Sequence, residues 1–399
     1  MSSFFSQTLA VINMNLLSLP RRIWMSLAMI LASAVVVAIL LAFLAMSKGF
    51  EVTLKGAGSK NIAMFLREGS AAELNSVLSK EQVNLIEDAP GIARDDKGPI
   101  VSAELYVIVD GIKKSSLTAA NLPLRGMSQR GIEMRRGFNL TRGRLFTPGT
   151  NEMIVGEGIL SEFNGFDLGQ TVRFGKTEWK VVGAFSTGGN VFESELWADV
   201  KVIQSLYHRG SSVQSIRAKL ASSADPATEI QAIKTYIKND PRLNIDVQTE
   251  ADYFATQGKS LNYMAIFGKV ISAIMALGAL AGALNTMYTS VSDRSREIAT
   301  LRTIGFSNSS AFIGTLVESL TLAALGGLLG ALAAYLLFDG MNTSTLGGSF
   351  TQVVFSFKLS ADLIIQGMVM ALVIGFISGV FPAWRAARMP VLMAFRTEG

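Results

Sequence analysis

The sequence predicts an α-helical integral membrane protein with four transmembrane helices and a large extracytoplasmic α/β domain inserted between helices 1 and 2. A bilayer core is crossed by about 20 apolar residues in a helix, and four stretches qualify: residues 23–46, 263–290, 311–338 and 363–384. Residues 47–262, between the first two stretches, have the composition of an ordinary globular domain. The mean hydropathy of +0.37 also indicates a membrane protein.

Composition excludes several classes of site. The chain has 399 residues, no cysteine and one histidine, His208, which excludes disulfides, thiolate metal sites and histidine-rich metal sites. The net charge of +5 is small, and the basic residues do not cluster as a nucleic-acid-binding face requires. We therefore expect no nucleic acid partner, no metal and no cofactor held by the chain itself.

Residues 1–22 are predicted to form a cytoplasmic amphipathic helix on the inner membrane face. Apolar residues recur there at mostly helical spacing: Phe4, Phe5, Leu9, Ile12, Leu16 and Leu19. A partly disordered leader is the alternative. The next stretch, residues 23–46, follows two arginines as a signal peptide would. It is longer than the roughly 7–15 apolar residues of a signal peptide and lacks a small-residue cleavage site, so we interpret it as a retained anchor.

The distribution of arginine predicts that both termini are cytoplasmic. Short loops rich in Lys and Arg stay on the inner side of the membrane. Such residues gather in three pieces of the chain: Arg21 and Arg22; Arg294, Arg296 and Arg302; and Arg385, Arg388 and Arg396. The loop over residues 339–362 has only Lys358 and is predicted to be periplasmic. The chain is thus predicted to be a multi-pass protein of the bacterial inner membrane, with residues 47–262 in the periplasm and a cytoplasmic tail over residues 385–399.

Residues 47–262 are predicted to fold as a mixed α/β domain. Segments rich in β-forming residues predict strands, over residues 61–66, 100–109, 152–155, 171–174, 178–185, 213–220 and 245–248. One helix opens with a capping box at residues 79–82, and another with the cap Asp225-Pro226. The first apolar helix is expected to continue to about Lys55, and a segment from residue 251 to run into the second. Two helical stalks would then hold the domain.

No complete catalytic or nucleotide-binding motif is present in the sequence. A phosphate-binding loop needs Gly-x-x-x-x-Gly-Lys-Ser/Thr, and Gly175-Lys176-Thr177 has Gln170 where the first glycine is required. Glu193 and Glu195 flank Ser194, which could be a hydrolytic carboxylate pair, but alternation along a strand or loop edge is the better interpretation. The other acidic residues are interspersed with basic ones, as on a solvated surface. A membrane-anchored enzyme is therefore the least supported function, and no catalytic residue is expected.

Residues 291–310 carry the most informative motif. Ile298, Leu301 and Ile304 recur at helical spacing, and Gly305 is a natural helix end. The other faces carry charged residues that would be available to a partner: Arg294, Arg296, Glu297 and Arg302. The segment is predicted to be a short amphipathic helix on the inner membrane surface. A basic loop that only sets the topology is the alternative.

This segment resembles the Arg-Glu-Ile-x-x-Leu-Arg-x-x-Gly signature of FtsX-like and MacB-like permeases of ABC transporters. Two further stretches are similar to that family: residues 318–330, with Glu-Ser-Leu and Leu-Gly-Gly-Leu-Leu-Gly, and residues 382–388, with Pro-Ala-x-x-Ala-Ala-Arg. The resemblance is specific over residues 260–399 and loose over the rest. It departs from MacB itself, which fuses an ATPase ahead of the permease. In this respect it resembles the members in which the ATPase is a separate chain.

The resemblance implies a permease subunit that works by mechanotransmission. The helix over residues 293–304 would be a coupling helix seated in a groove of a cytoplasmic ABC ATPase, which binds the ATP. The coupling residues would be Arg294, Arg296, Glu297, Ile298, Leu301, Arg302 and Gly305. Closure of the ATPase would push two permease copies together, as a homodimer or with a paralogue, and the stalks would move the periplasmic domain.

Two functions are compatible with the resemblance. The first is export or extraction of an amphiphile, a peptide or a lipoprotein, with a periplasmic adaptor protein as a further partner. The alternative is an FtsX-like transmembrane signalling scaffold that activates a periplasmic cell-wall hydrolase. The insert over residues 47–262 is larger than that of the division-type permeases, which favours the exporter.

Polar residues inside the predicted spans are of interest because charge in lipid is costly; they are Lys269, Asn285 and Glu318. Lys269 would lie near the outer interface and extend its ammonium group to water. Glu318 would pair with an arginine of the coupling helix or of the tail, and a proton-transfer role is the alternative. Gly-x-x-x-Gly patterns predict close helix packing, within one chain rather than along a dimer seam, and begin at Gly278, Gly326 and Gly375.

Overall fold

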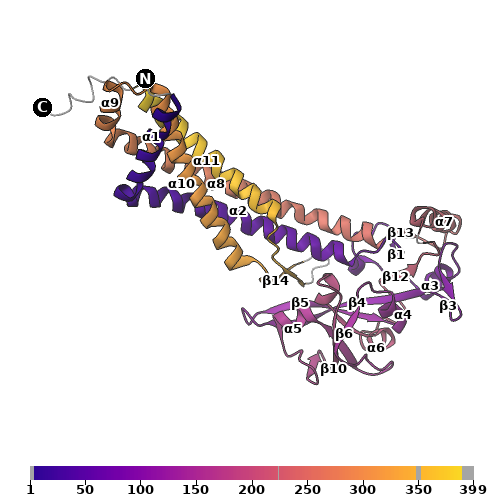
Figure 1. The fold of residues 1–399 in the computed structure, drawn as a ribbon. Helices are drawn as coiled ribbons and strands as arrows, with labels where there is room; N and C mark the ends of the chain where they lie inside the picture. The colour runs from indigo at the N-terminus through magenta and orange to yellow at the C-terminus, as the bar shows by residue number, and fades with distance from the viewer. Residues whose placement is uncertain (1–3, 223, 347–351, 389–399) are drawn as a thin grey trace. The chain divides into compact units, whose positions relative to one another are not determined.

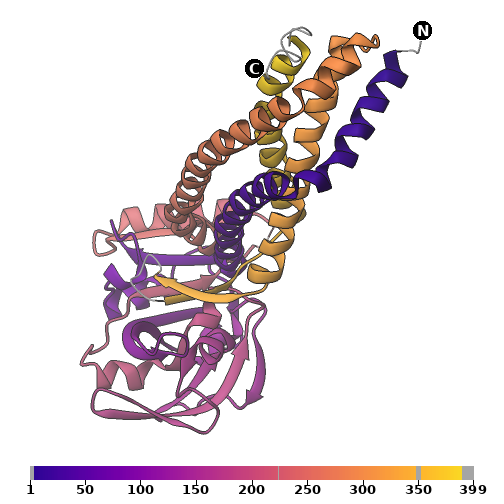
Figure 2. The ribbon, with the colours of Figure 1, turned by 90° about the vertical axis from the view of Figure 1, so that its left-hand side faces the viewer.

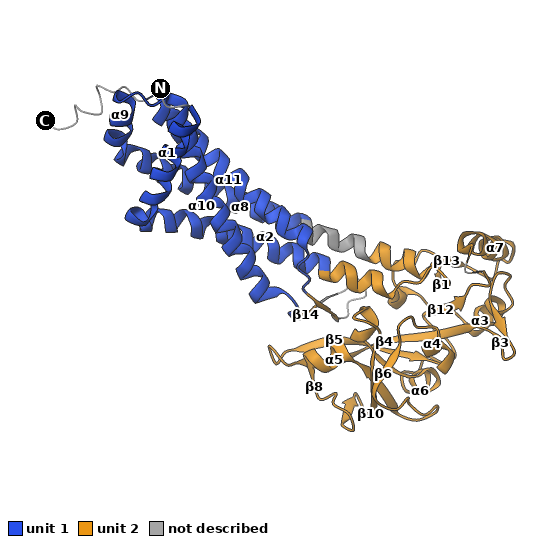
Figure 3. Cartoon of the chain, viewed as in Figure 1, with its two compact units in different colours: residues 1–48, 263–341, 357–399 blue, residues 49–262, 342–356 orange. Residues whose placement is uncertain are grey.

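The computed structural model describes residues 4–222, 224–346 and 352–388, with the backbone alone for residues 258–265, 345–346 and 352. The chain forms two compact units, coloured separately in Figure 3. The helical unit comprises residues 1–48, 263–341 and 357–399, and the α/β unit comprises residues 49–262 and 342–356. Residues 389–399, which belong to the predicted tail over residues 385–399, lie outside the described residues.

Helices build the described part of the helical unit (Figure 1): α1 (Phe4–Ser18), the 3-10 helix η1 (Leu19–Arg22), α2 (Ile23–Ala57), α8 (Glu250–Asp293), α9 (Ser295–Thr303), α10 (Asn308–Phe338) and α11 (Ala361–Arg388). Four segments are long and apolar enough to cross a bilayer, within residues 4–57, 266–293, 308–338 and 361–388. The prediction of four long apolar helices is therefore confirmed. The continuation of α2 beyond Lys55 and the single long helix α8 are also as expected.

Small residues let these helices approach one another. The orange α10 and the yellow α11 run side by side in Figure 2. A Cβ added at Gly379 of α11 would lie 2.7 Å from Ser319 Cβ of α10, and one added at Gly326 of α10 would lie 2.6 Å from the Ile30 carbonyl oxygen of α2. Two of the three Gly-x-x-x-Gly patterns thus serve packing within the chain, as predicted. A Cβ added at Gly278 would have no described atom of another element within 4 Å.

Gly326→Ala is expected to destabilise the helical unit by about 1–3 kcal/mol, because the added methyl group meets a backbone oxygen that cannot move aside. The matched control is Gly278→Ala, which meets no described atom within 4 Å and gains up to about 1 kcal/mol of helix propensity. Thermal melting of the full chain in detergent measures both. Equal melting temperatures for the two variants would contradict this packing.

An 11-stranded sheet, counted within the described residues, is the frame of the α/β unit. Its strands are β1 (Ile62–Arg67), β4 (Val101–Lys113), β5 (Ala119–Met127), β6 (Asn139–Gly143), β7 (Glu152–Gly156), β8 (Phe163–Asn164), β9 (Thr171–Phe174), β10 (Thr177–Ser186), β11 (Leu196–Asp199), β12 (Ser215–Lys219) and β13 (Ile245–Thr249). Across the sheet the order is β13-β1-β12-β4-β5-β11-β7-β10-β6, with β8 beside β4 and β9 beside β10. Only β5–β11 and β7–β10 are parallel among these described pairs.

Short helices and two small hairpins complete the described part of the unit. The helices are η2 (Glu73–Asn75), α3 (Lys80–Glu87), α4 (Gln129–Glu133), α5 (Glu157–Glu162), η3 (Val191–Ser194), α6 (Val200–Leu206) and α7 (Pro226–Asn239). The hairpins are β2–β3 (Arg94–Asp95 and Gly98–Pro99) and β14–β15 (Asn342–Leu346 and Gln352–Ser356). β14–β15 comes from the segment between α10 and α11, where the sequence analysis expected only a loop. It packs on the α/β unit, where the Val354 N–H donates to Ser194 Oγ at 2.8 Å.

The predicted strands all form, and the predicted helix starts are confirmed. Ser79 and Gln82 make both hydrogen bonds of the capping box, and the Asp225 side chain accepts from the Thr228 N–H. Four strands of the sheet were not predicted: β5, β6, β8 and β11. β5 has Pro123 inside it and no β-branched residue, so local propensity is poor; it forms because it pairs with β4 over a long antiparallel register.

One face of the sheet carries two apolar cores. The first core lies on β4, β5, β7, β10 and β11 under α5 and α6, and includes Leu105, Leu124 and Trp179. The second lies on β1, β12 and β13 under α3 and α7, and includes Phe65 and Ile233. β4 contributes residues to both. Because side chains alternate along a strand, every other residue of these strands points to the opposite face.

Candidate functional site

The predicted coupling segment forms helix α9, and its end follows from the sequence. α9 runs from Ser295 to Thr303, and Gly305 has φ +100°, a left-handed conformation that suits glycine. The Phe306 N–H donates to the Leu301 carbonyl at 3.1 Å, and the Gly305 N–H to the Arg302 carbonyl at 3.2 Å. This pair of bonds is the Schellman motif. It fixes the direction in which the chain leaves α9 towards α10.

Arg294, just before α9, does not face a partner. Its side chain is 4% exposed, and Nη1 lies 3.1 Å from Glu318 Oε2 of α10, which is equally buried. Nε donates to Glu297 Oε2 at 3.1 Å, and Nη2 donates to Asn15 Oδ1 of α1. The expectation that Arg294 is available to a partner is therefore corrected: its guanidinium joins three helices of the helical unit. Glu318 has the arginine partner that the sequence predicted.

The outer face of α9 carries the residues that remain accessible. Arg296 and Glu297 are exposed, and Ile304 just after the helix is 69% exposed. Ile298 is buried and packs against Val291 and Ala386. Leu301 and Arg302 are half-buried. Ile304, which recurs at helical spacing with Ile298 and Leu301, is thus turned outward, and Gly305 follows it directly.

Helix α1 covers α9 and α10 from the other side. It buries Thr8, Val11 and Asn15 and exposes Phe5 and Leu9. Thr8 Oγ1 lies 3.1 Å from Ser310 Oγ of α10, and Gln7 Oε1 accepts from the Ser307 N–H at 3.3 Å. The prediction of a helix here is confirmed. The face of α1 that contacts protein carries Thr8, Val11 and Asn15, and the opposite face exposes Phe5 and Leu9.

The other polar residues that were predicted inside spans are not buried as Glu318 is. Lys269 and Asn285 are exposed in the helical unit. The Asn285 carbonyl accepts the Thr289 hydroxyl at 2.9 Å, a bond within α8. A second arginine of this region, Arg22, donates to the Ser290 carbonyl at 2.8 Å and to Ser290 Oγ at 2.9 Å. Buried polar contacts thus join α1, α9 and α10 at one end of the helical unit, and another set, around Ser319 and Ser378, joins α10 and α11.

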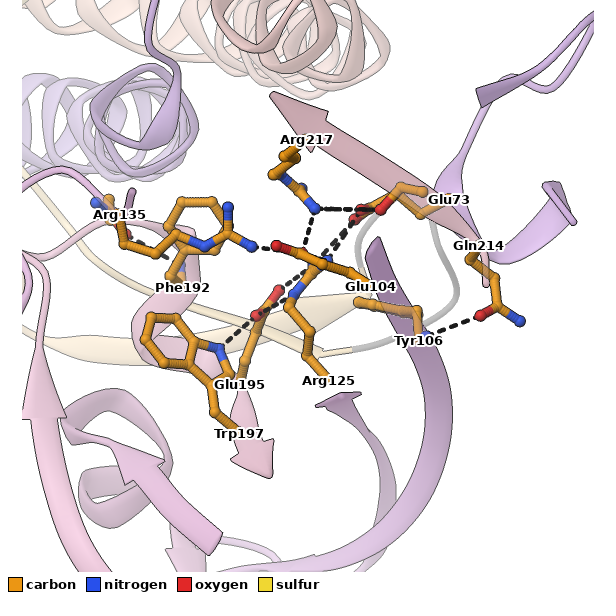
Figure 4. Close-up of polar contacts among 12 residues, drawn as sticks. Glu73, Glu104, Tyr106, Arg125, Arg135, Phe192, Glu195, Trp197, Gln214 and Arg217 are labelled. Atoms are coloured by element: carbon orange, nitrogen blue, oxygen red, sulfur yellow. Dashed lines mark hydrogen bonds and ion pairs between the residues drawn. The ribbon is translucent and has the colours of Figure 1, made fainter. Parts of the chain in front are cut away.

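The α/β unit holds a second site, which the sequence analysis missed (Figure 4). We define the charge cluster by its buried ionisable side chains, all of which except Glu250 are labelled in Figure 4: Glu73, Glu104, Arg125, Arg135, Glu195, Arg217 and Glu250. Strand alternation produces it. Each central charged residue is next to a core residue on its strand: Glu104 on β4, Arg125 on β5 and Arg217 on β12. Because side chains alternate, these three point to the face opposite the two cores.

Arg125 lies at the centre of the cluster (Figure 4). Its Nε and Nη2 donate to the two oxygens of Glu195 at 2.7 and 2.6 Å. Its Nη1 and Nη2 donate to the two oxygens of Glu73 at 2.9 Å each, and Nη1 also donates to Glu104 at 3.0 Å. Three carboxylates thus share one guanidinium, in the bidentate geometry that arginine favours.

The other two arginines extend the cluster to the first turn of α8. Arg217 Nη1 lies 2.8 Å from Glu73, and its Nε lies 3.0 Å from Glu250 Oε1. Arg135 lies 3.5 Å from the same Glu250 oxygen. Both arginines also pair with Glu104. Strands β12, β4 and β5 therefore contribute to one connected set of ion pairs, together with Glu195, which directly precedes β11.

Aromatic rings close the cluster off from water. Arg135 Cζ lies 4.5 Å from the Phe192 ring centroid, and Phe192 in turn contacts Phe254 of α8. Trp197 stacks on Phe185 with ring centroids 3.9 Å apart, and its Nε1 donates to Glu195 at 2.8 Å. In this low-dielectric setting, ion pairs are strong and unpaired charges are costly.

Burial and the arginines act in opposite directions on the cluster carboxyls. Burial alone would raise the pKa of Glu73, but Arg125 and Arg217 lower it well below its usual value. For Glu250 burial dominates over Arg217 and Arg135, so its pKa is raised. The description of the acidic residues as a solvated face is therefore wrong for these four glutamates. The signal in the sequence that could have indicated buried ion pairs was the presence of isolated charged residues, such as Arg217, inside segments predicted as strands.

Two family models match the chain. Residues 25–236 match the family model of the MacB-like periplasmic core domain, and residues 269–391 match the model of the FtsX-like permease C-terminal domain. The first match alone covers more than half of the chain. The chain belongs to the family of MacB-like and FtsX-like ABC transporter permeases.

Several relatives of this permease are known. The macrolide export ATP-binding/permease protein MacB of Shewanella oneidensis is 23% identical over 381 residues, which cover 84% of this chain and 55% of that one. A MacB 2 protein of Yersinia pestis is 25% identical and covers 66% of this chain and 40% of that one. An uncharacterized ABC transporter permease of Methanocaldococcus jannaschii is 22% identical, covering 86% and 85%. The permease thus spans about half the length of the MacB relatives that it matches.

Solved structures of single domains also resemble the permease. The periplasmic region of MacB from Actinobacillus actinomycetemcomitans matches with a TM-score of 0.37 and 17% identity, over 51% of this chain and 94% of that one. The extracellular domain of the transporter YknZ matches with a TM-score of 0.36 and 15% identity, over 47% and 100%.

Proposed function

We propose that this permease is the membrane-spanning subunit of an ABC transporter and that a cytoplasmic ABC ATPase on a separate chain drives it. The observation that carries the proposal is the construction of α9. Its outer face offers Arg296 and Glu297, while Arg294 holds it to Glu318 and Asn15 from beneath. A partner that grips α9 therefore pulls on α10 and α1 as well.

The four apolar helical stretches would cross the bacterial inner membrane, with both termini in the cytoplasm. This orientation places the arginine-rich α9 on the inner side, as the charge rule requires. It also suits α1, whose Phe5 and Leu9 are 83% and 69% exposed and would lie in the membrane surface. The α/β unit would then be periplasmic.

Two copies of the chain, or this chain and a paralogue, would close together when the ATPase pair binds ATP. The helices α2 and α8, which continue from the helical unit into the α/β unit, would carry the movement. The work done there is export or extraction of an amphiphile, a peptide or a lipoprotein. A periplasmic adaptor protein would complete the path outward. The ATPase, not this chain, would bind the nucleotide.

Affinity purification of the full chain from its native membrane tests the proposal. We expect an ABC ATPase to be retained by the wild type, and its retention to fall at least tenfold for the double variant Arg296→Ala, Glu297→Ala. The control is Arg142→Ala with Glu157→Ala, an exposed ion pair of the α/β unit at 3.2 Å. Absence of an ATPase from the wild-type sample, or equal retention by the variant, would refute the proposal.

The same experiment separates the exporter from the signalling scaffold. A co-purified periplasmic adaptor supports export. A co-purified cell-wall hydrolase or its activator, with the ATPase still present, would instead identify the chain as an FtsX-like scaffold through which ATP hydrolysis switches on that hydrolase.

A further inference from the structure

We propose that the charge cluster is the joint through which α8 moves the α/β unit, and that Glu250 is the positioning residue of this joint. The inference rests on the proposed function, which requires some part of the periplasmic domain to receive the movement of the helices. It deepens that function by naming the side chains that receive it.

Glu250 lies where both connecting helices meet the sheet. It is the first residue of α8 and directly follows β13. Its Oε2 accepts the Ser59 N–H at 3.3 Å, just beyond the end of α2. The Ala251 N–H donates to the Ser59 carbonyl at 3.2 Å, and a Cβ added at Gly58 would lie 2.6 Å from Ala251 Cα. The end of α2 and the start of α8 are therefore in backbone contact at this residue.

From Glu250 the ion pairs reach the strands of both cores. Arg217 and Arg135 connect it to Glu104 on β4, the strand that the two cores share. From there the chain of ion pairs continues through Arg125 to Glu195 beside β11. A displacement of the first turn of α8 is thus passed to β12, β4, β5 and β11 together.

Directional ion pairs suit this task better than an apolar contact. An apolar surface can slide by repacking, whereas a bidentate guanidinium–carboxylate pair holds one geometry. Breaking a buried pair also leaves an uncompensated charge, which is costly. The next turn of α8 adds a second fixed point, because Tyr253 Oη accepts the Glu73 N–H at 3.4 Å and Phe254 packs edge-on to Phe192.

The charge balance of the cluster assigns Glu250 a proton. Four carboxyl groups face three guanidinium groups, so one negative charge is in excess in a region that is at most 5% exposed. Glu73, Glu104 and Glu195 each form an ion pair with Arg125, whereas the ion pairs of Glu250 are with Arg217 and Arg135. The raised pKa of Glu250 and the lowered pKa values of Glu73 and Glu104 agree with this assignment.

Spin labels test the joint in the full chain with its ATPase in lipid nanodiscs. The chain has no cysteine, so Thr256→Cys on α8 and Lys176→Cys in the β9–β10 turn give two exposed labelling sites. We expect one narrow distance distribution in the wild type, with and without ATP. Glu250→Ala should broaden it on ATP addition, whereas Glu250→Gln should keep it narrow because glutamine resembles the protonated carboxyl. Asp252→Ala, which removes an exposed carboxylate from the same turn, is the control and should remain narrow.

The outcomes distinguish the two proposals. If the wild type retains no ATPase, the proposed function fails and the joint fails with it. If the ATPase is retained and Glu250→Ala stays as narrow as the wild type, the joint alone is refuted. If Glu250→Gln broadens like the alanine variant, the bound proton is refuted.

Melting temperatures provide a second test that needs no ATPase. A carboxyl whose pKa is raised by folding stabilises the protein fully below its unfolded value of 4.5 and ceases to do so as the pH rises through its folded pKa. The melting temperature of Glu250→Gln relative to wild type should therefore increase as the pH rises above the unfolded value of 4.5. Glu73 and Glu104, with lowered pKa values, lose their contribution only towards lower pH. A difference that stays constant over this range would refute the protonated Glu250.

Discussion

Replacing Arg125 with alanine is expected to unfold most of the α/β unit at 37 °C. The substitution leaves Glu73, Glu104 and Glu195 buried together without the guanidinium that they share. Removing one partner of a buried ion pair costs about 3–5 kcal/mol, and a typical domain has only about 5–15 kcal/mol of stability. The loss is therefore a large fraction of what holds the unit folded.

Tryptophan fluorescence during urea unfolding of the full chain measures this loss. Trp197 donates to Glu195 at 2.8 Å and reports on the cluster directly. A background with Trp24→Phe and Trp384→Phe removes the tryptophans of the helical unit. Arg125→Lys should fall between wild type and Arg125→Ala, because lysine keeps the charge but not the forked geometry.

The control for this prediction is a surface ion pair of the same unit. Arg142 and Glu157 lie 3.2 Å apart with 55% and 33% exposure, and such pairs contribute about 0–1 kcal/mol. Arg142→Ala should therefore leave the unfolding midpoint nearly unchanged. If Arg125→Ala cost no more than Arg142→Ala, the cluster would not stabilise the fold.

Replacing Arg294 with alanine is expected to reduce the permease's stimulation of ATP hydrolysis by its ATPase at least tenfold. The exposed face of α9 is unchanged in this variant. Glu318 would remain 4% exposed and without its arginine, a state that costs about 3–5 kcal/mol. The helical unit would relieve this cost by moving α9 away from α10 and α1. Since a tenfold loss corresponds to about 1.4 kcal/mol, even partial displacement of α9 would be measurable. The assay is ATP hydrolysis by the reconstituted complex in proteoliposomes.

A double variant separates misplacement of α9 from loss of a direct contact. Arg294→Met with Glu318→Met removes both charges, and replacing a buried pair by apolar side chains is often neutral. We therefore expect the double variant to recover most of the stimulation that Arg294→Ala loses. Arg296→Ala should not be rescued by Glu318→Met, because Arg296 is exposed on the other side of the helix. Full stimulation by Arg294→Ala would show that α9 is held without this pair.

The features that the sequence predicted correctly are those whose causes lie within a few residues. The capping box at Ser79 and Gln82 and the cap at Asp225 each depend on neighbours three positions away. The end of α9 depends on the Gly305 and Phe306 N–H groups, which donate to the carbonyls of Arg302 and Leu301 just before them in the chain. The long apolar helices were equally visible, since length and hydropathy alone define them. Residues 291–310 also carried the family signature that the family models confirm.

The arrangement of charges could not be predicted in the same way. Arg296 and Arg294 are two residues apart and equally basic, yet one is exposed and the other is buried against Glu318 of a different helix. Likewise Glu195 looked like a surface residue beside Glu193, because its partner Arg125 lies on another strand. Whether a charged residue faces water or a counter-charge depends on which elements are brought beside it.

By itself, the sequence determined the permease family, the four long apolar helices and the inserted α/β domain, together with the helix starts at Ser79 and Asp225. Only the tertiary structure decided that seven ionisable residues, spread from Glu73 to Glu250, form one cluster at the start of α8. The physical reason is the range of the interactions. Caps, turns and apolar stretches are local and leave local patterns, whereas an ion pair between strands exists only after the sheet order β12-β4-β5-β11 has formed.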